Sequence, residues 1–264
     1  MVTKPINNIT TLLLRWYKDN KRNLPWRKNI TPYNIWVSEI ILQQTRVMQG
    51  LGYYYRFLEA FPAIDVLAST TEDKLLRIWQ GLGYYSRARN MHKAANQIMQ
   101  KHGGIFPSAY KDLLSLPGVG PYTAAAIASI AYQLPYPVLD GNVFRVVARL
   151  FAIEKDITLP ATRKITEDIM CHLIDKSNPG DFNQAAMEFG ALQCTPVNPA
   201  CTQCILKDKC LAYHKGLVQS LPIKPAKRLS KRRYSIFYPL HNNNKVAIEK
   251  ERGKTYGNLC TSFL

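Results

Sequence analysis

The chain has 264 residues, and 35 Lys and Arg against 18 Asp and Glu give it a formal net charge of +17. A content of 47% hydrophobic and 20% charged residues excludes a mostly disordered chain, and the length allows one large or two ordinary domains. The longest nearly apolar stretch, 124–132, is far shorter than the roughly 20 residues of a membrane span, and residues 1–11 lack a secretory signal pattern. We therefore expect a cytoplasmic or nuclear protein that binds a polyanion, most commonly nucleic acid; a basic surface without a specific partner is the alternative.

Helices are predicted over most of residues 8–213, because apolar residues recur at three- and four-residue spacing. The segments are 9–17, 35–47, 53–61, 74–79, 87–100, 109–114, 123–132, 143–151 and 165–174. Pro and Gly mark the breaks, and no alternating strand pattern occurs before residue 233. The expected fold class is all-α, followed by a short β-hairpin formed by 234–240 and 245–249. Cys171 lies in the last helical segment and is interpreted as a small core residue.

The first candidate functional residue, Glu39, lies in a mostly apolar predicted helix over residues 32–47. Glu39, Gln43 and Arg46 follow one another at i, i+4 and i+7, which places them on one polar stripe. Taken alone, this stripe predicts a surface Glu39 that pairs with Arg46.

Residues 116–123 (LPGVGPYT) form the most distinctive loop of the helical region. Gly118 and Gly120 permit a close backbone approach and leave N–H groups at a positive helix end, which is typical of an anion site. Val119, between them, would pack the flanking helices together, as in a helix-hairpin-helix. Asp140 follows Gly120 by twenty residues, at a predicted helix start where an Asp is ordinarily an N-cap.

Four of the six cysteines fall within seventeen residues, in the spacing Cys-x6-Cys-x2-Cys-x5-Cys: Cys194, Cys201, Cys204 and Cys210. A compact set of four thiolates in a reducing compartment binds zinc or an iron–sulfur cluster, whereas two disulfides would need an oxidising one. The spacing forms a single loop around one centre, which favours a [4Fe–4S] cluster over the paired knuckles of zinc sites. Cys260 lies outside the motif and receives no role.

The composition changes after residue 215. Six of the ten residues in 224–233 are basic, so 216–233 is interpreted as a basic linker. This linker is either a solvated spacer or a segment that binds along the phosphate backbone of a nucleic acid. Only 31 residues follow Arg233, fewer than the roughly 40 that support an independent core.

Together these motifs resemble the endonuclease III superfamily of helix-hairpin-helix DNA base-excision glycosylases. Within it, residues 38–45 (SEIILQQT), 81–89 (GLGYYSRAR) and 116–123 are similar to the MutY-type adenine DNA glycosylases. The resemblance covers residues 8–215 and implies a discontinuous iron–sulfur domain (1–28 and 136–215) around a helix-hairpin-helix barrel domain (29–135). Residues 234–264 would be a truncated Nudix-like remnant, so we expect weaker discrimination for 8-oxoguanine than in a complete relative.

The resemblance implies a monofunctional, monomeric DNA glycosylase of base excision repair that removes adenine opposite 8-oxoguanine or guanine in double-stranded DNA. Cleaving a purine from its sugar requires a protonated leaving base and a stabilised sugar cation, which two carboxyl groups in different environments provide. By resemblance, Glu39 protonates N7, Asp140 stabilises the cation, and Asn142 orients Asp140 or the attacking water. Tyr122 stands where bifunctional relatives carry a Schiff-base Lys, and no Lys occurs between residues 111 and 155.

The base must leave the stack before it reacts. By resemblance, Gln44 and Tyr84 insert into the duplex beside the mispair. Gln184 stands where some relatives place a Glu against the adenine amino edge. The other residues that the resemblance places at the adenine pocket or the DNA are Arg22, Leu24, Trp26, Arg27, Leu42, Val47, Gly118, Gly120 and Arg87.

Two other functions stay open from the sequence. An endonuclease III-like glycosylase and lyase acting on oxidised pyrimidines is disfavoured by Tyr122. A non-catalytic module that binds mispairs is disfavoured by the pair Glu39 and Asp140, because a binding protein has no need of both carboxyl groups.

Overall fold

The computed structural model describes residues 7–225, 241–242 and 245–246. The chain divides into two compact units, Met1–Pro225 and Ala226–Leu264. In the second unit, the described strands β1 (His241–Asn242) and β2 (Lys245–Val246) pair antiparallel, with His241 opposite Val246. Several predicted features lie outside the described residues. They are the strand 234–240, residues 247–249, the linker beyond residue 225, Cys260 and most of the segment 234–264 that was expected to be Nudix-like.

The first unit is helical, so the expected all-α fold class is confirmed. Its α-helices are α1 (Asn7–Asn20), α2 (Pro25–Lys28), α3 (Pro32–Leu42), α4 (Val47–Ala60), α5 (Ile64–Ser69), α6 (Glu72–Trp79), α7 (Ser86–His102), α8 (Tyr110–Ser115), α9 (Pro121–Ala126), α10 (Gly141–Leu150), α11 (Pro160–Leu173), α12 (Pro179–Leu192) and α13 (Leu211–His214). Short 3₁₀ turns at Cys201–Gln203 and Lys207–Lys209 lie between α12 and α13. No described helix is long and apolar enough to cross a membrane.

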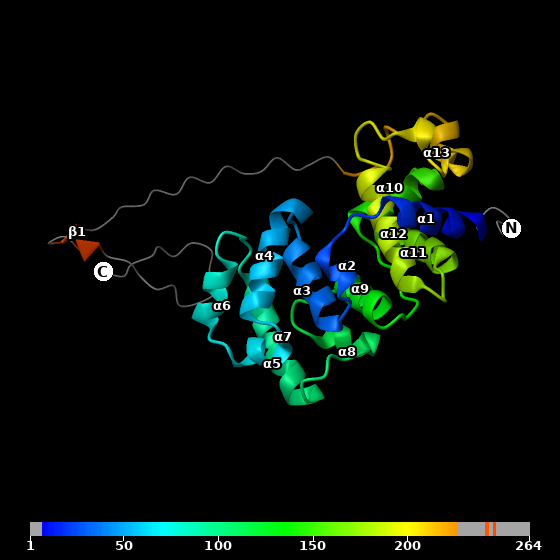
Figure 1. Ribbon diagram of the computed structural model, residues 1–264. Helices are drawn as coiled ribbons and strands as arrows, with labels where there is room; N and C mark the ends of the chain where they lie inside the picture. The colour runs from blue at the N-terminus through cyan, green and yellow to red at the C-terminus, as the bar shows by residue number, and fades with distance from the viewer. Residues whose placement is uncertain (1–6, 226–240, 243–244, 247–264) are drawn as a thin grey trace. The chain divides into compact units, whose positions relative to one another are not determined.

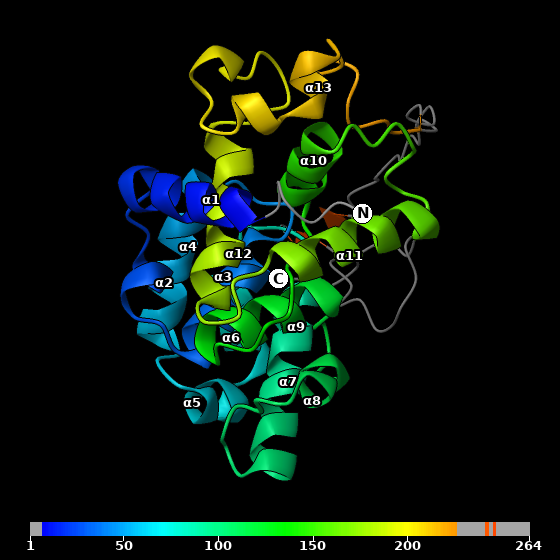
Figure 2. The same cartoon turned by 90° about the vertical axis from the view of Figure 1, so that its right-hand side faces the viewer.

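Two buried hydrophobic clusters hold this unit together. One lies among α3 to α9 and contains Trp36, Phe57 and Trp79. The other joins α1, α10 and α12, where the rings of Trp16 and Phe189 meet edge to face with centroids 5.0 Å apart. Figure 1 shows α1 grouped with α10 to α13 on one side and α3 to α8 on the other, and in Figure 2 the segment with α13 lies against the end of α10. The domain boundaries inferred above stay a prediction.

The predicted helix over 35–47 is broken between α3 and α4. Gln44 adopts a left-handed backbone conformation (φ 57°), which a right-handed helix does not accommodate. Gln43 and Arg46 therefore lie beyond the end of α3, and the predicted polar stripe is wrong. Glu39 is buried instead of lying on the surface, with only 8% of its area exposed.

The predicted helix over 123–132 begins at Pro121 as α9 and then widens into a π-helix, Ile127–Ala131. Within this turn the Ser129 hydroxyl donates to the carbonyl of Ala125 at 2.7 Å, a side-chain bond that competes with the α-helical backbone pattern.

Helix α12 is absent from the predicted segments. Its buried residues occupy nearly every side of the helix, so the sequence carries no apolar stripe. Cys171 was expected in the core but is exposed on α11. The buried face of α11 holds Met170, and the next residue is rotated by about 100° from that face.

Candidate active site

A cavity of about 220 Å³ lies where the two hydrophobic clusters meet. It brings together residues of α2, α3, α9, α10 and α12, and the side chain of Met187 packs against both clusters. Eleven predicted site residues line it: Arg22, Leu24, Trp26, Arg27, Glu39, Leu42, Val47, Tyr122, Asp140, Asn142 and Gln184. The remaining lining residues are Thr45, Ile130, Met187, Glu188 and Ala191.

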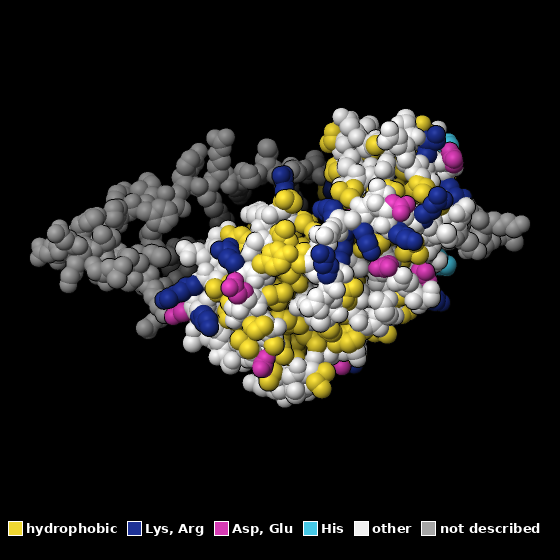
Figure 3. Space-filling model, in the orientation of Figure 1, with side chains coloured by type: hydrophobic (Ala, Val, Ile, Leu, Met, Phe, Trp, Pro, Cys, Tyr) yellow, Lys and Arg dark blue, Asp and Glu magenta, His cyan; other side chains and the backbone are white. Residues whose placement is uncertain are grey.

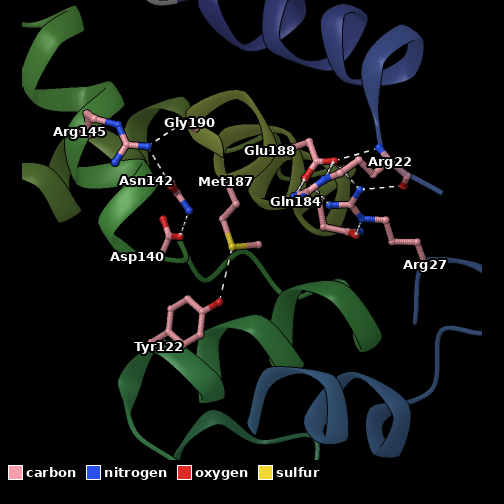
Figure 4. Close-up of polar contacts among 10 residues, drawn as sticks. All are labelled: Arg22, Arg27, Tyr122, Asp140, Asn142, Arg145, Gln184, Met187, Glu188 and Gly190. Carbon is pink, nitrogen blue, oxygen red and sulfur yellow. Dashed lines mark hydrogen bonds and ion pairs between the residues drawn. The ribbon is translucent and has the colours of Figure 1, made fainter. Parts of the chain in front are cut away.

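Glu39 enters this cavity from α3 and meets Tyr122 from α9. The Tyr122 hydroxyl donates a hydrogen bond of 2.6 Å to Oε2 of Glu39. The same hydroxyl lies 3.7 Å from the sulfur of Met187 (Figure 4). Burial raises the pKa of Glu39 to about 7; the Tyr122 hydrogen bond opposes this shift, and the charge of Asp140 adds to it. A carboxyl group in this state exchanges a proton near neutral pH.

Asp140 begins α10 and is fixed from two sides. Its Oδ1 accepts the backbone N–H of Val143 at 2.7 Å, so its interpretation as an N-cap is confirmed. Its Oδ2 accepts the Asn142 amide at 2.6 Å, and the other side of that amide accepts from Arg145 at 2.8 Å (Figure 4). Burial raises the pKa of Asp140 above its ordinary value, although the hydrogen bonds from Val143 and Asn142 oppose this shift. The carboxylate of Asp140 thus accepts from a backbone N–H and an amide, whereas the carboxyl of Glu39 meets the Tyr122 hydroxyl.

A buried carboxylate on α12, Glu188, holds two arginines at the opposite end of the cavity (Figure 4). Arg22 and Arg27 each donate two side-chain hydrogen bonds to it, at 2.7 to 2.9 Å. Burial pushes the pKa of Glu188 upward, but these bonds outweigh burial and lower it to about 2. Arg27 also donates through Nε to Oε1 of Gln184 at 3.1 Å. The side chain of Gln184 is thereby tied to the arginine pair.

The four motif cysteines line one small cavity beside α10 and α12. Arg149 donates to Sγ of Cys194 at 3.4 Å, burial raises the pKa of Cys204 to about 11, and none of the described cysteines forms a disulfide. Within the described part of the chain, no three His, Cys, Asp or Glu side chains converge on a single-ion position. Four thiols around one shared gap are a donor set that suits an iron–sulfur cluster or a zinc ion.

Comparison with known proteins identifies the family. Residues 37–171 match the HhH-GPD superfamily of base excision DNA repair proteins. The chain belongs to this superfamily. It is 39% identical over 248 residues to the adenine DNA glycosylase of Buchnera aphidicola subsp. Schizaphis graminum (92% of this chain, 70% of the relative). It is 42% identical over 225 residues to the adenine DNA glycosylase of Rattus norvegicus (81% of this chain), of which it spans only 44%.

Solved structures give the same fold. A thermostable thymine-DNA glycosylase superposes with a TM-score of 0.73 at 27% identity, covering 79% of this chain and 96% of that chain. An endonuclease III in a non-covalent DNA complex has a TM-score of 0.67 at 21% identity, covering 80% of this chain and 95% of that chain, and supports the fold alone. This HhH-GPD protein is therefore a base excision repair glycosylase in fold and family.

The remaining predicted DNA-contacting residues of this glycosylase lie outside the cavity: Gln44, Tyr84, Gly118, Gly120 and Arg87. Gln44 and Tyr84 are exposed, and both adopt left-handed backbone conformations, with φ of 57° and 47°. Gly118 has a φ of 78°, and a Cβ there would lie 2.8 Å from Cβ of Asn90, so only glycine fits. Gly120 is the N-cap of α9. Arg15, Lys18, Lys21 and Lys28, in α1, α2 and the segment between them, are exposed. Figure 3 shows basic side chains gathered over this part of the molecule.

Arg87 differs from the other predicted DNA contacts, because it is buried and its Nη atoms donate to backbone carbonyls of the protein itself. An inward position of this kind is not explained by a direct contact with DNA.

Sequence reasoning missed Glu188, Met187 and Arg145. The first two lie on α12, which has no periodic signal, and Arg145 lies on the predicted helix over 143–151 without any motif to mark it. The one available signal was charge, because Glu188 and Arg145 each have apolar neighbours on both sides in the sequence, and ionisable residues are rarely buried without a partner.

Proposed function

We propose that this HhH-GPD glycosylase excises adenine from double-stranded DNA, opposite 8-oxoguanine or guanine, by hydrolysis without a lyase step. The observation that carries the proposal is that Glu39 and Asp140 line one cavity and differ in their surroundings. The names of the relatives from Buchnera and rat support adenine as the base.

In the proposed reaction, Glu39 supplies the proton. Its pKa of about 7 means that the protonated form is well populated at neutral pH, so it gives its proton to N7 of the extruded adenine as the glycosidic bond breaks. Asp140, whose carboxylate oxygens accept hydrogen bonds from Val143 and Asn142, stabilises the positive charge that arises on the sugar. A water molecule then attacks the sugar, with Asn142 as a hydrogen-bonding group beside it.

The absence of a lyase step follows from the groups around the reacting carbon. No lysine lines the cavity. Tyr122 stands where bifunctional relatives carry a Schiff-base Lys, and its hydroxyl donates a hydrogen bond to Glu39. Burial raises the pKa of Tyr122 well above its ordinary value, so the phenol stays protonated and a poor nucleophile. The amine that β-elimination requires is therefore missing from this cavity.

We assign the walls of the cavity to the extruded base. Leu24, Trp26, Leu42 and Val47 offer apolar surface for the purine ring. Because Oε1 of Gln184 accepts from Arg27, the amide NH₂ is the side that remains to bond the base. Gln44 and Tyr84 insert into the duplex, and the backbone at Gly118 and Gly120 approaches a phosphate. The protein acts as a monomer on the DNA.

Cys194, Cys201, Cys204 and Cys210 would hold a [4Fe–4S] cluster. Bound there, the cluster would fix the fold of the loop from Cys194 to Cys210 and present Lys207 and Lys209 to phosphates. Arg145 and Arg149 already anchor this loop by donating to the carbonyls of Cys194 and Thr195, both at 2.7 Å. Hydrolysis of the glycosidic bond transfers no electrons, so none of its steps depends on the cluster.

The test is alkali-dependent nicking of labelled duplexes by the purified full chain. We expect cleavage at adenine in A:8-oxoguanine and A:G duplexes, no cleavage of A:T, and no covalent adduct after borohydride treatment. Cleavage of a thymine glycol duplex with a borohydride-trapped adduct would instead assign the lyase function on oxidised pyrimidines. Tight mispair binding without any strand breaks would assign a non-catalytic binding module.

A further inference from the structure

Two exposed loops of this protein each hold a non-glycine residue in the left-handed backbone region. Gln44 lies between α3 and α4, and Tyr84 lies between α6 and α7. L-residues other than Asn and Asp rarely adopt this conformation, and it persists only when the surrounding structure holds it. Local hydrogen bonds support both loops: the Thr45 N–H donates to the carbonyl of Leu42 at 3.1 Å, and Trp79 Nε1 donates to the carbonyl of Gly83 at 3.0 Å. A side chain from outside either loop adds a further restraint that the two loops share.

One buried side chain, Arg87 near the start of α7, bonds to both loops. Its Nη1 donates to three carbonyls at the end of α3 and just beyond it, at 2.6 to 3.0 Å: those of Ile40, Ile41 and Gln43. Its Nη2 donates to the carbonyls of Leu82 and Gly83 in the second loop, at 3.4 and 3.2 Å. One guanidinium group thus joins the residue before Gln44 to the residue before Tyr84.

The buried guanidinium group of Arg87 depends on the carbonyl groups of both loops to balance its charge. It lies over the rings of Trp79 and Tyr84, with centroids 5.3 and 5.5 Å from Cζ. No carboxylate of residues 7–225 forms an ion pair with it, so carbonyl dipoles and aromatic faces balance its charge. A buried cation without its acceptors is costly, so the positions of the two loops and of the guanidinium depend on one another. The planar guanidinium group directs its N–H donors at two sets of carbonyl groups in different directions, and a lysine ammonium group does not.

We propose that Arg87 is a positioning residue that holds both loops in the conformation from which Gln44 and Tyr84 enter the duplex. This inference rests on the proposed function, because it takes those two residues as the inserting pair. Arg87 then acts on extrusion of the base and contacts neither the base nor a phosphate. Its effect depends on whether adenine must be drawn out of a stacked pair.

The experiment compares Arg87→Lys with wild type under single-turnover conditions on two substrates. One carries adenine opposite 8-oxoguanine, and the other carries an adenine that is already unstacked in a single-nucleotide bulge. We expect about a tenfold loss on the paired adenine and a change within about twofold on the bulged one. Arg89→Lys is the matched control, because Arg89 lies two residues further along α7 and pairs with exposed Glu72; it should behave as wild type on both.

A double-mutant cycle with Tyr84→Ala tests the route of the effect. Because Arg87 holds the loop of Tyr84 as well as the loop of Gln44, Arg87→Lys should slow the paired substrate by clearly less in the Tyr84→Ala background than in the wild-type background. Equal losses on both substrates, or the same loss in both backgrounds, would overturn the proposal and leave Arg87 a general structural residue. A displaced pH profile would also overturn it, because it would indicate an effect on Glu39, the neighbour of Ile40.

A second variant covers the case in which Arg87→Lys does not fold. Gly83 has a φ of 75° and open space where a Cβ would lie, so Gly83→Ala strains the second loop without a steric clash. It should reproduce the selective loss on the paired adenine, whereas Gly52→Ala, also in open space but within α4, should not. An unselective loss in Gly83→Ala contradicts the proposal. A wild-type protein that excises neither adenine contradicts the proposed function itself.

Discussion

The hydroxyl of Tyr122 donates a 2.6 Å hydrogen bond to Oε2 of Glu39 across 83 positions of sequence. This bond joins α9, which follows the helix-hairpin-helix loop, to α3, which carries the proposed acid. It stabilises the ionised carboxylate, yet burial outweighs it and leaves the pKa of Glu39 at about 7. The two opposing effects together place this carboxyl near the middle of its titration at neutral pH.

Replacing Glu39 with Gln should remove the proton donor while keeping the hydrogen bond from Tyr122. We expect single-turnover excision to fall at least about 100-fold, the usual contribution of a positioned general acid. Glu72→Gln, which alters an exposed partner of Arg89, should leave the rate within about twofold of wild type. An active Glu39→Gln enzyme would remove Glu39 from the mechanism.

The same substitution should change how stability depends on pH. A buried carboxyl whose pKa rises from 4.5 to about 7 keeps its proton in the folded state when the unfolded chain has lost it. The free energy of unfolding therefore falls as pH rises from about 4.5 to 7, by roughly 3 kcal/mol from this group. Urea unfolding at pH 5 and pH 8 should show Glu39→Gln gaining stability relative to wild type at the higher pH. A constant difference would contradict the raised pKa.

Tyr122→Phe should move the alkaline limb of the pH–rate profile upward. The lost hydrogen bond had lowered the pKa of Glu39, so the acid form of Glu39 should persist to a higher pH. The profile of single-turnover rate against pH measures this midpoint. Tyr33→Phe serves as the control, because the Tyr33 hydroxyl donates to the carbonyl of Phe61 away from the cavity; a downward shift in Tyr122→Phe would refute the assignment.

Glu188→Gln should destabilise the fold, because Arg22 and Arg27 would lose the carboxylate that accepts from both. We expect a loss of about 3 kcal/mol in the free energy of unfolding at neutral pH, the scale of a broken buried ion pair. Since the pKa of Glu188 is lowered to about 2, the difference from wild type should shrink as pH falls from about 4.5 towards 2. Denaturant unfolding between pH 7 and pH 3 tests both statements, and a loss below about 1 kcal/mol would contradict them.

Cys204→Ser should reduce the iron and acid-labile sulfide content of the purified protein, bleach its visible absorbance and lower its melting temperature. The exposed thiol of Cys171 offers a matched control, and Cys171→Ser should retain both iron and colour. Stoichiometric zinc without visible absorbance in the wild-type protein would replace the cluster with a zinc site.

Local sequence patterns were enough to predict the elements that carry the chemistry. Helical spacing marked α1, α7 and α10, and Asp140 is the helix cap that its position indicated. The spacing of Glu39, Tyr122, Asp140 and the cysteines, read as a resemblance, selected side chains that line two cavities. These predictions succeed because helix propensity, capping and motif spacing depend on residues a few positions apart.

The tertiary structure alone decided which groups are buried and what they bind. The periodic pattern placed Glu39 on a surface beside Arg46, but the break at Gln44 and the packing of α9 and α12 enclosed it. Glu188 accepts from Arg27, 161 positions earlier, and Arg87 binds carbonyls more than forty positions away. Burial and such distant partners set pKa values and loop conformations, and neither is encoded in any short stretch of the chain.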